Sequence, residues 1–77
     1  MEAYQERVVE ELMQLTERYE KLRVFLESEK FNDVVKEEQH RMHMQLQAMG
    51  TYKTILEQRV GYFGYFGYFV YFESLNK

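Results

Sequence analysis

A heptad pattern of apolar residues runs through the first third of the chain and constrains its fold more than any other feature. Between Glu2 and Leu26 the apolar residues recur at alternating intervals of four and three: Val8, Leu12, Leu15, Tyr19, Leu22 and Leu26. Because an α-helix has about 3.6 residues per turn, residues at these intervals share one helix face. The positions between them are mostly Glu, Gln, Arg and Lys, which favour helix. The pattern predicts a long amphipathic helix over residues 2–27.

A second apolar stripe predicts a second helix over residues 34–60. Its members are Val35, Met42, Leu46, Met49, Leu56 and Val60, with Tyr52 and Ile55 beside them. The segment SEKFND, residues 28–33, separates the stripes and is rich in cap-forming residues. We predict a short turn capped by Ser28 that places Phe31 on the core, with Asn32 or Asp33 starting the second helix. Two long helices joined by a short connection form an antiparallel hairpin, so the predicted fold is all-α.

The small size of the chain predicts self-association. A chain of 77 residues buries only about 60% of its unfolded surface, and with no cysteine it has neither disulfides nor a thiolate zinc site to stabilise it. Two stripes of this width also cover each other only in part. We expect the flanking residues Val9, Met13 and Ile55 to contact a second hairpin, so that the chain forms a homo-oligomeric helical bundle.

An aromatic repeat follows the predicted hairpin. Residues 61–72 read GYF, GYF, GYF, VYF and hold eight of the 13 aromatic residues, so the core is built mainly from Leu, Met and Val. We therefore divide the chain into a hairpin domain, 1–60, and an aromatic tail, 61–77. The tail is either an extension of the second helix, where three glycines would cost up to about 3 kcal/mol, or a strand, or a repeat without a selected role. Its candidate self-association residues are Tyr62, Phe63, Phe66 and Phe69.

Composition and charge exclude several function classes. A net charge of −3 argues against bulk nucleic-acid binding, which depends on neutralising phosphates with Lys and Arg. The longest apolar run, 60–72, is shorter than the ~20 residues of a spanning helix, and no targeting leader is evident. We expect a cytoplasmic protein that does not contact a membrane. No cysteine nucleophile, serine beside a base or glycine-rich phosphate loop is present, so we expect neither an enzyme nor a cofactor.

One basic cluster is a candidate ligand site. In the segment TERYEKLR the cluster comprises Arg18, Tyr19, Lys21 and Arg23. Arg18 and Lys21 lie three residues apart on one helix face, where they could bind a phosphate, and Tyr19 could stack on a base. The alternative is that neighbouring glutamates pair with these cations and that Tyr19 packs in the core.

Helix two carries two further patterns with alternative interpretations. Glu37, His40 and His43 form E-x-x-H-x-x-H, a spacing found in metal-binding bundles, but the remaining ligands of such a site are missing. We therefore predict no metal site and two histidines that are solvated or flank the seam. The methionines Met42 and Met44, with Met49, could form an adaptable binding groove or fill an irregular core.

The chain also resembles a known group of proteins. The resemblance rests on four segments: KLRVFLESEKF (21–31), EEQ (37–39), QLQAM (45–49) and YKTILEQRV (52–60). In these segments it resembles a family of short, helical-hairpin accessory proteins encoded by tailed phages, mostly of unassigned function. The resemblance implies a non-enzymatic phage protein that oligomerises in the host cytoplasm and counters host defence. It would do so by sequestering a nucleotide signal, such as a cyclic nucleotide, or by inhibiting a host immune protein. The alternative is a self-assembling structural protein whose aromatic tail drives association.

Overall fold

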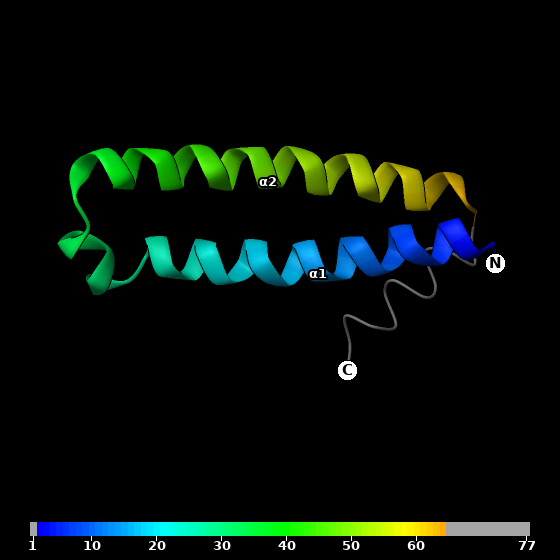
Figure 1. The fold of residues 1–77 in the computed structure, drawn as a ribbon, viewed down its shortest axis with the longest axis horizontal. Coiled ribbons are helices and arrows are strands. Elements are labelled where there is room, and N and C mark those ends of the chain that lie inside the picture. The colour runs from blue at the N-terminus through cyan, green and yellow to red at the C-terminus, as the bar shows by residue number, and fades with distance from the viewer. Residues whose placement is uncertain (1, 65–77) are drawn as a thin grey trace.

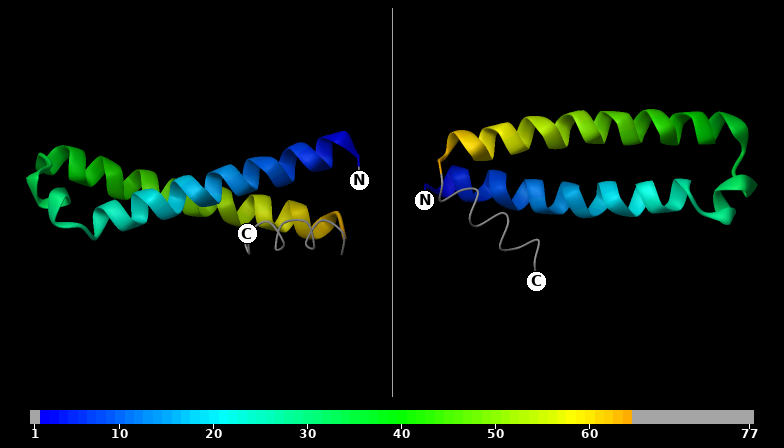
Figure 2. Two further views of the ribbon diagram at one scale, coloured as in Figure 1. Left: turned by 90° about the horizontal axis from the view of Figure 1, so that it is seen from below. Right: turned by 180° about the vertical axis from the view of Figure 1, so that it is seen from behind.

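The protein is an antiparallel pair of helices joined by one short helical turn. The computed structural model describes residues 2–64, in which α1 spans Ala3–Leu26, the 3-10 helix η1 spans Glu29–Asp33 and α2 spans Lys36–Tyr62. The two long helices lie side by side over their full length (Figure 1), and the view from below shows that they cross each other at an angle (Figure 2, left). The predicted all-α helical hairpin is confirmed.

Helix α1 begins and ends within one residue of its predicted bounds. At its start the backbone N–H of Glu2 donates to the side-chain carbonyl of Gln5 at 2.9 Å. At its end the hydroxyl of Ser28 donates to the carbonyl of Phe25 at 2.6 Å. Ser28 therefore satisfies the C-terminus of α1, whereas we had predicted that its side chain would cap the following turn.

The short turn places Phe31 in the hairpin interior, as predicted. Phe31 lies in η1 and is buried. Its ring makes edge-to-face contacts with Phe25, at a centroid distance of 6.1 Å, and with His43, at 5.5 Å. Three aromatic rings from α1, η1 and α2 thus close the connected end of the hairpin.

Helix α2 begins later than predicted. Its first residue is Lys36, and Val35 precedes it in an extended conformation with 68% of its surface exposed. The prediction that Val35 belongs to the core was wrong, as was the prediction that Asn32 or Asp33 starts the helix. The reason is that residues 29–33 form their own 3-10 turn, which leaves Val35 outside the helical period.

The side chain of Gln39 holds the connection in place. Its amide nitrogen lies 3.0 Å from the carbonyl oxygen of Phe31 and 2.8 Å from that of Val34. One side chain on the first turn of α2 therefore bonds two loop carbonyls, of which that of Phe31 also accepts the backbone N–H of Val34 at 3.0 Å.

Replacing Gln39 should loosen this connection. Gln39→Ala removes both hydrogen bonds from a half-buried position, and we expect a loss of about 1–2 kcal/mol in unfolding free energy, measured by urea denaturation. Gln45→Ala is the matched control, because that exposed glutamine lies on the same helix and its amide contacts only Met49. Equal stability of the two variants would contradict the assigned role.

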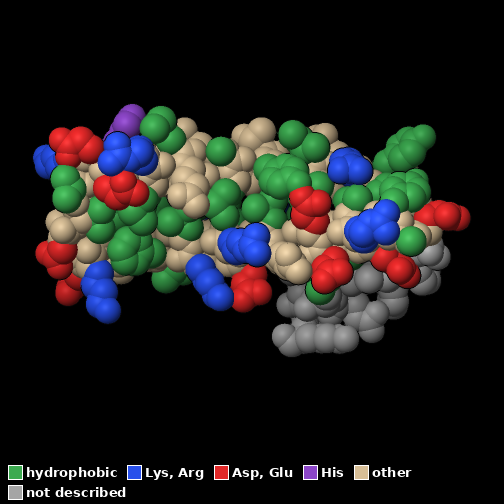
Figure 3. Space-filling view, viewed as in Figure 1, with side chains coloured by type: hydrophobic (Ala, Val, Ile, Leu, Met, Phe, Trp, Pro, Cys, Tyr) green, Lys and Arg blue, Asp and Glu red, His purple; other side chains and the backbone are tan. Residues whose placement is uncertain are grey.

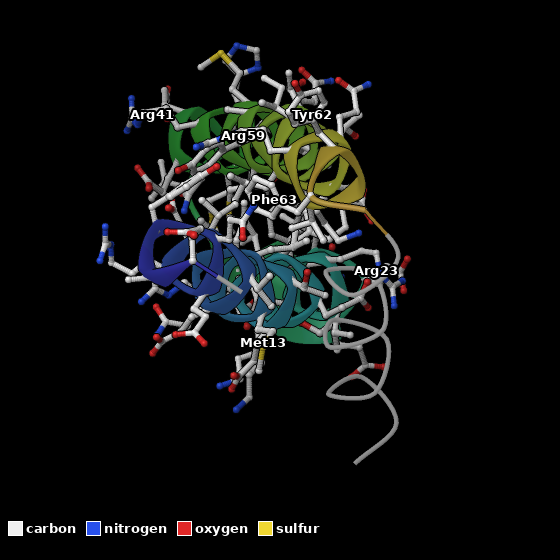
Figure 4. All side chains as sticks on the ribbon, turned by 90° about the vertical axis from the view of Figure 1, so that its right-hand side faces the viewer. Met13, Arg23, Arg41, Arg59, Tyr62 and Phe63 are labelled. Atoms are coloured by element: carbon white, nitrogen blue, oxygen red, sulfur yellow. The ribbon has the colours of Figure 1, made fainter. Side chains whose placement is uncertain are left out.

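The hydrophobic core lies toward the open end of the hairpin. Its buried members come from the first half of α1 and the last turns of α2: Val8, Val9, Leu12, Leu15, Leu56 and Val60. Met49 and Phe63 pack against this cluster. The ring of Phe63 lies between the two helices (Figure 4) and meets Tyr4 edge to face at 5.8 Å. The residues that close this end are therefore far apart in sequence.

The predicted self-association residues of the hairpin differ in burial. Val9 is 3% exposed and belongs to the core, so the hairpin itself covers it and it is not a flank left for a second copy. Met13 and Ile55 are 37% and 47% exposed. Met13 points away from α2 on the far side of α1 (Figure 4). Val9 was misassigned because α1 buries a wider face than the heptad stripe alone.

The first aromatic triplet ends α2. Tyr62 is the last helical residue and is 91% exposed, while Phe63 caps the helix. Gly64 has a φ of +94°, in the left-handed region that favours glycine, and this terminates the helix. Within the described residues, α2 therefore extends two residues beyond position 60. Phe66 and Phe69, also predicted to associate, lie outside the described residues.

Hydrophobic side chains also reach the surface. They follow the seam between the helices and, separately, the upper edge over α2 (Figure 3). Those on the outer surface of α2 include Met44, Tyr52, Ile55 and Tyr62. Within residues 2–64, neither helix has a stretch long and apolar enough to cross a membrane.

Candidate functional site

The predicted basic cluster does not converge on one point. Lys21 pairs with Glu17, with 2.9 Å between the ammonium nitrogen and a carboxylate oxygen. The hydrogen bond and charge of Lys21 lower the pKa of the Glu17 carboxyl, with a small contribution from Arg18. Arg18 is exposed and makes no ion pair with residues 2–64. Glutamate pairing, the alternative considered above, therefore occupies Lys21.

Arg23 is held by two carboxylates on the same helix. Its guanidinium lies 2.9 Å from Glu20 and 3.2 Å from Glu27. The hydrogen bond from Arg23 to Glu20 and the negative charges of both glutamates raise the pKa of the guanidinium above its ordinary value. Tyr19 lies one turn before Arg23 and adds to this effect. Arg23, rather than Arg18 or Lys21, is therefore the cation on the Tyr19 side of α1.

Tyr19 faces α2 and packs against Gly50, a position of α2 that has no side chain. Gly50 lies opposite the Tyr19 ring, and a Cβ built on Gly50 would lie 3.3 Å from a ring carbon, tighter than most real contacts. Gly50 costs roughly 1 kcal/mol of helix propensity relative to Ala. The close approach of the tyrosine ring accounts for glycine at this position.

A hollow opens beside this contact. It has a volume of about 400 Å³, and its lining is one residue of α1 and five of α2: Tyr19, Leu46, Gln47, Gly50, Thr51 and Thr54. This volume lies in the range of about 300–1,000 Å³ typical of small-molecule sites. Tyr19 is the one predicted ligand residue that lines it, whereas Arg18 and Lys21 do not.

The lining can stack on a flat ring and accept hydrogen bonds. Thr51 donates its hydroxyl to the carbonyl of Gln47 at 3.2 Å, and Thr54 donates to the carbonyl of Gly50 at 3.1 Å. The threonine oxygens therefore remain as acceptors, and the exposed amide of Gln47 offers both donors and an acceptor. The phenol ring of Tyr19 supplies an aromatic surface.

A second hollow lies near the start of α2. It has a volume of about 610 Å³ and is lined by Lys36, Glu37, His40, Arg41 and Met44. His43 instead contacts Phe31, so the two histidines do not share a site. In the described part of the chain, no group of three or more His, Cys, Asp or Glu residues is placed to hold a metal ion.

The methionines of α2 do not form one groove. Met42 and Met49 are half-buried, and Met49 packs on the core, whereas Met44 is exposed at the second hollow. Met49 therefore fills the core, whereas Met44 lies on the outer surface of α2.

Sequence reasoning identified Tyr19 but missed its partners on α2. Gly50 carried a signal, since a glycine inside a helical stripe is costly unless something approaches it closely. Arg23 on α1 belongs to the predicted basic cluster, and it lies four residues after Tyr19 and so on the same helix face. Gln47 and Thr54 carried none, because the register between the two helices decides which polar residues meet Tyr19.

These observations define a two-helix hairpin protein with a hollow between its helices. The Sequestin family model matches residues 2–62 of this chain, which therefore belongs to the Sequestin family. The match ends at the last residue of α2, so residues 63–77 of the aromatic tail lie beyond it. No curated protein and no solved structure matched the chain.

Proposed function

We propose that this protein is a non-enzymatic, phage-encoded sequestering protein that acts in the host cytoplasm. In this proposal it binds a nucleotide signal of host defence in the hollow beside Tyr19 and so keeps the signal from its receptor. The family name supports a sequestering role. The observation that carries the choice of site is the hollow of about 400 Å³ beside the contact of Tyr19 with Gly50.

The lining suggests how such a ligand would be held. A nucleobase would stack on the ring of Tyr19, a contact worth about 1–3 kcal/mol per base in other proteins. The amide of Gln47 and the hydroxyl oxygens of Thr51 and Thr54 would pair with polar atoms of the base or ribose. Arg23, one turn from Tyr19, would contact a phosphate, although it must share its guanidinium with Glu20 and Glu27.

Self-association is part of the proposal. The hollow is open and lies on a single hairpin, so one chain offers limited burial for a ligand. A homo-oligomer would carry several hollows and would also cover the exposed apolar side chains of α2. Sequestration is stoichiometric, so affinity must be high; a Kd of 1 nM corresponds to about −12.3 kcal/mol.

The test is calorimetric titration with a panel of cyclic mono- and dinucleotides. We expect at least one to bind with a submicromolar Kd and to raise the melting temperature. Tyr19→Ala should weaken binding about tenfold or more through lost stacking, and Gly50→Leu should abolish it by filling the hollow. Circular dichroism of both variants must show retained helicity.

Two control variants separate the hollow from the originally predicted cluster. Arg18→Ala and Lys21→Ala alter cations outside the hollow and should leave binding within about twofold, because neither side chain lines it. Loss of binding in these variants, with Tyr19→Ala unaffected, would move the site to the exposed face of α1. Failure of the entire panel would favour direct inhibition of a host immune protein, which should then co-purify with the tagged chain.

A self-assembling structural protein is the second candidate. The exposed apolar side chains of α2, Met44, Tyr52, Ile55 and Tyr62, favour it. It predicts that function resides in the assembly and that the aromatic tail contributes to it. Deleting residues 65–77 tests the tail: an unchanged number of copies per oligomer would exclude the tail as the driving element.

A further inference from the structure

The outer surface of α2 carries a second helical stripe that does not face α1. Its members are Glu37, Arg41, Met44, Ala48, Tyr52, Ile55 and Arg59, and all of them are exposed. At about 100° per residue, each lies within about 40° of the direction of Ala48. Arg41 and Arg59 project from the same side of α2, away from the inter-helix seam (Figure 4). The stripe is therefore a continuous face about six turns long.

The members of this stripe are symmetric about Ala48 in sequence. Met44 and Tyr52 lie four residues to either side of it, and Arg41 and Ile55 lie seven residues to either side. Glu37 and Arg59 lie eleven residues to either side. When two copies of one helix pack antiparallel on a two-fold axis through Ala48, each residue meets its counterpart on the other side.

This arrangement makes two of the three pairs complementary, and the third places Ile55 opposite Arg41. Glu37 of one copy meets Arg59 of the other at both ends, and neither residue has an ion-pair partner within residues 2–64. Met44 meets the ring of Tyr52, a favourable sulfur–aromatic contact. Ala48, the smallest side chain of the stripe, lies on the axis and allows close approach of the helices. A parallel pair would instead place Glu37 against Glu37 and Arg59 against Arg59.

The second hollow fits the same arrangement. Glu37, His40, Arg41 and Met44 lie at positions i, i+3, i+4 and i+7, which form the four-residue hole that receives a side chain in helix–helix packing. The residue of the partner that is symmetric to the centre of this hole is Ile55, which is 47% exposed in the single hairpin. The second hollow thus lies where Ile55 of the partner would reach it, and Met44 supplies an apolar lining for that side chain.

From these observations we propose that two copies of the chain pair antiparallel through the outer stripe of α2, with Ala48 on the two-fold axis and Ile55 of each copy in the hollow of the other. The product is a four-helix dimer with α2 helices at its centre. It makes specific the self-association included in the proposed function but does not depend on the ligand. Gln47, Gly50 and Thr54 lie on another side of α2, so each chain keeps its hollow open.

Charge reversal tests the orientation. Sedimentation equilibrium of the full chain should give about 19 kDa, twice the chain mass of 9.5 kDa. Glu37→Arg and Arg59→Glu each place like charges together at both ends of the dimer, so each variant alone should dimerise about tenfold more weakly. An equimolar mixture of the two variants restores both ion pairs and should recover the dimer. A monomeric wild type, an assembly unaffected by either reversal, or a mixture no better than its components would overturn the proposal.

A cysteine scan tests the axis independently. The chain has no native cysteine, so Ala48→Cys introduces one thiol per copy. On the two-fold axis the two thiols face each other, and mild oxidation should convert most of the protein to a cross-linked dimer. Gln47→Cys, the neighbouring exposed position about 100° away around the helix, should remain largely uncrosslinked. Cross-linking of Gln47→Cys in preference to Ala48→Cys would contradict this register. Neither result bears on the proposed nucleotide site, because the calorimetric titration measures ligand binding by the uncrosslinked chain.

Discussion

Leu12→Ala is expected to remove most of the free energy of unfolding of this chain. Leu12 is fully buried and packs with Leu56 and Val60, which are also fully buried, in the small core at the open end. Truncating a buried leucine costs about 2–5 kcal/mol through lost burial and the cavity that remains. We expect about 3–4 kcal/mol here, because the few residues around the site leave little material to fill the cavity. A small domain has only about 5 kcal/mol to lose.

The adjacent residue supplies the control for Leu12. Met13 is a similarly sized side chain on the same helix, but it is 37% exposed and points away from α2. Met13→Ala should cost less than about 1 kcal/mol. Urea denaturation followed by circular dichroism, at equal chain concentration, measures both. Comparable losses for the two variants would mean that α1 does not bury the face described above.

Phe31→Ala should produce the second large loss, about 3 kcal/mol in unfolding free energy. Phe31 is buried and its ring meets Phe25 and His43 edge to face, so truncation removes apolar burial and two aromatic contacts. It also removes the side chain that anchors η1 between the helices. We expect hydrogen exchange to accelerate first at the turn and at the first residues of α2.

Phe31→Leu separates ring contacts from volume. Leucine retains most of the apolar burial and should cost about 1 kcal/mol, the worth of the aromatic contacts. If alanine and leucine variants were equally destabilised, the edge-to-face geometry would explain the whole effect and burial would explain none. A loss below about 1 kcal/mol for Phe31→Ala would show that the connected end is held by Gln39 alone.

The fold was predictable because its main determinant is local. The apolar stripe of α1 has no interruption, so its period alone sets both ends of the helix to within a residue. The start of α2 was less predictable, because Val35 continues the spacing of the stripe while the backbone there is extended. The side chain of Gln39, which bonds two loop carbonyls, favours that local geometry, and no pattern of apolar residues reports it.

The candidate site was predictable only in part, because it depends on how the helices are offset. Tyr19 was identifiable as an aromatic residue near cations, but its position over Gly50 follows from packing between α1 and α2. Likewise, Arg18 and Lys21 share a helix face in sequence, yet Lys21 is engaged by Glu17 and neither reaches the hollow. Side-chain contacts within one helix could be predicted from the sequence, whereas contacts between the two helices could not.

The position of the core at the open end has a consequence for the newly made chain. Leu12 and its neighbours are synthesised early, but their partners Leu56 and Val60 follow about 44–48 residues later. At a typical synthesis rate of about 5–20 residues per second, the apolar face of α1 waits roughly 2 to 10 seconds before it can be covered. During that interval the nascent helix exposes the same surface that a chaperone or a second nascent chain on the same messenger would bind.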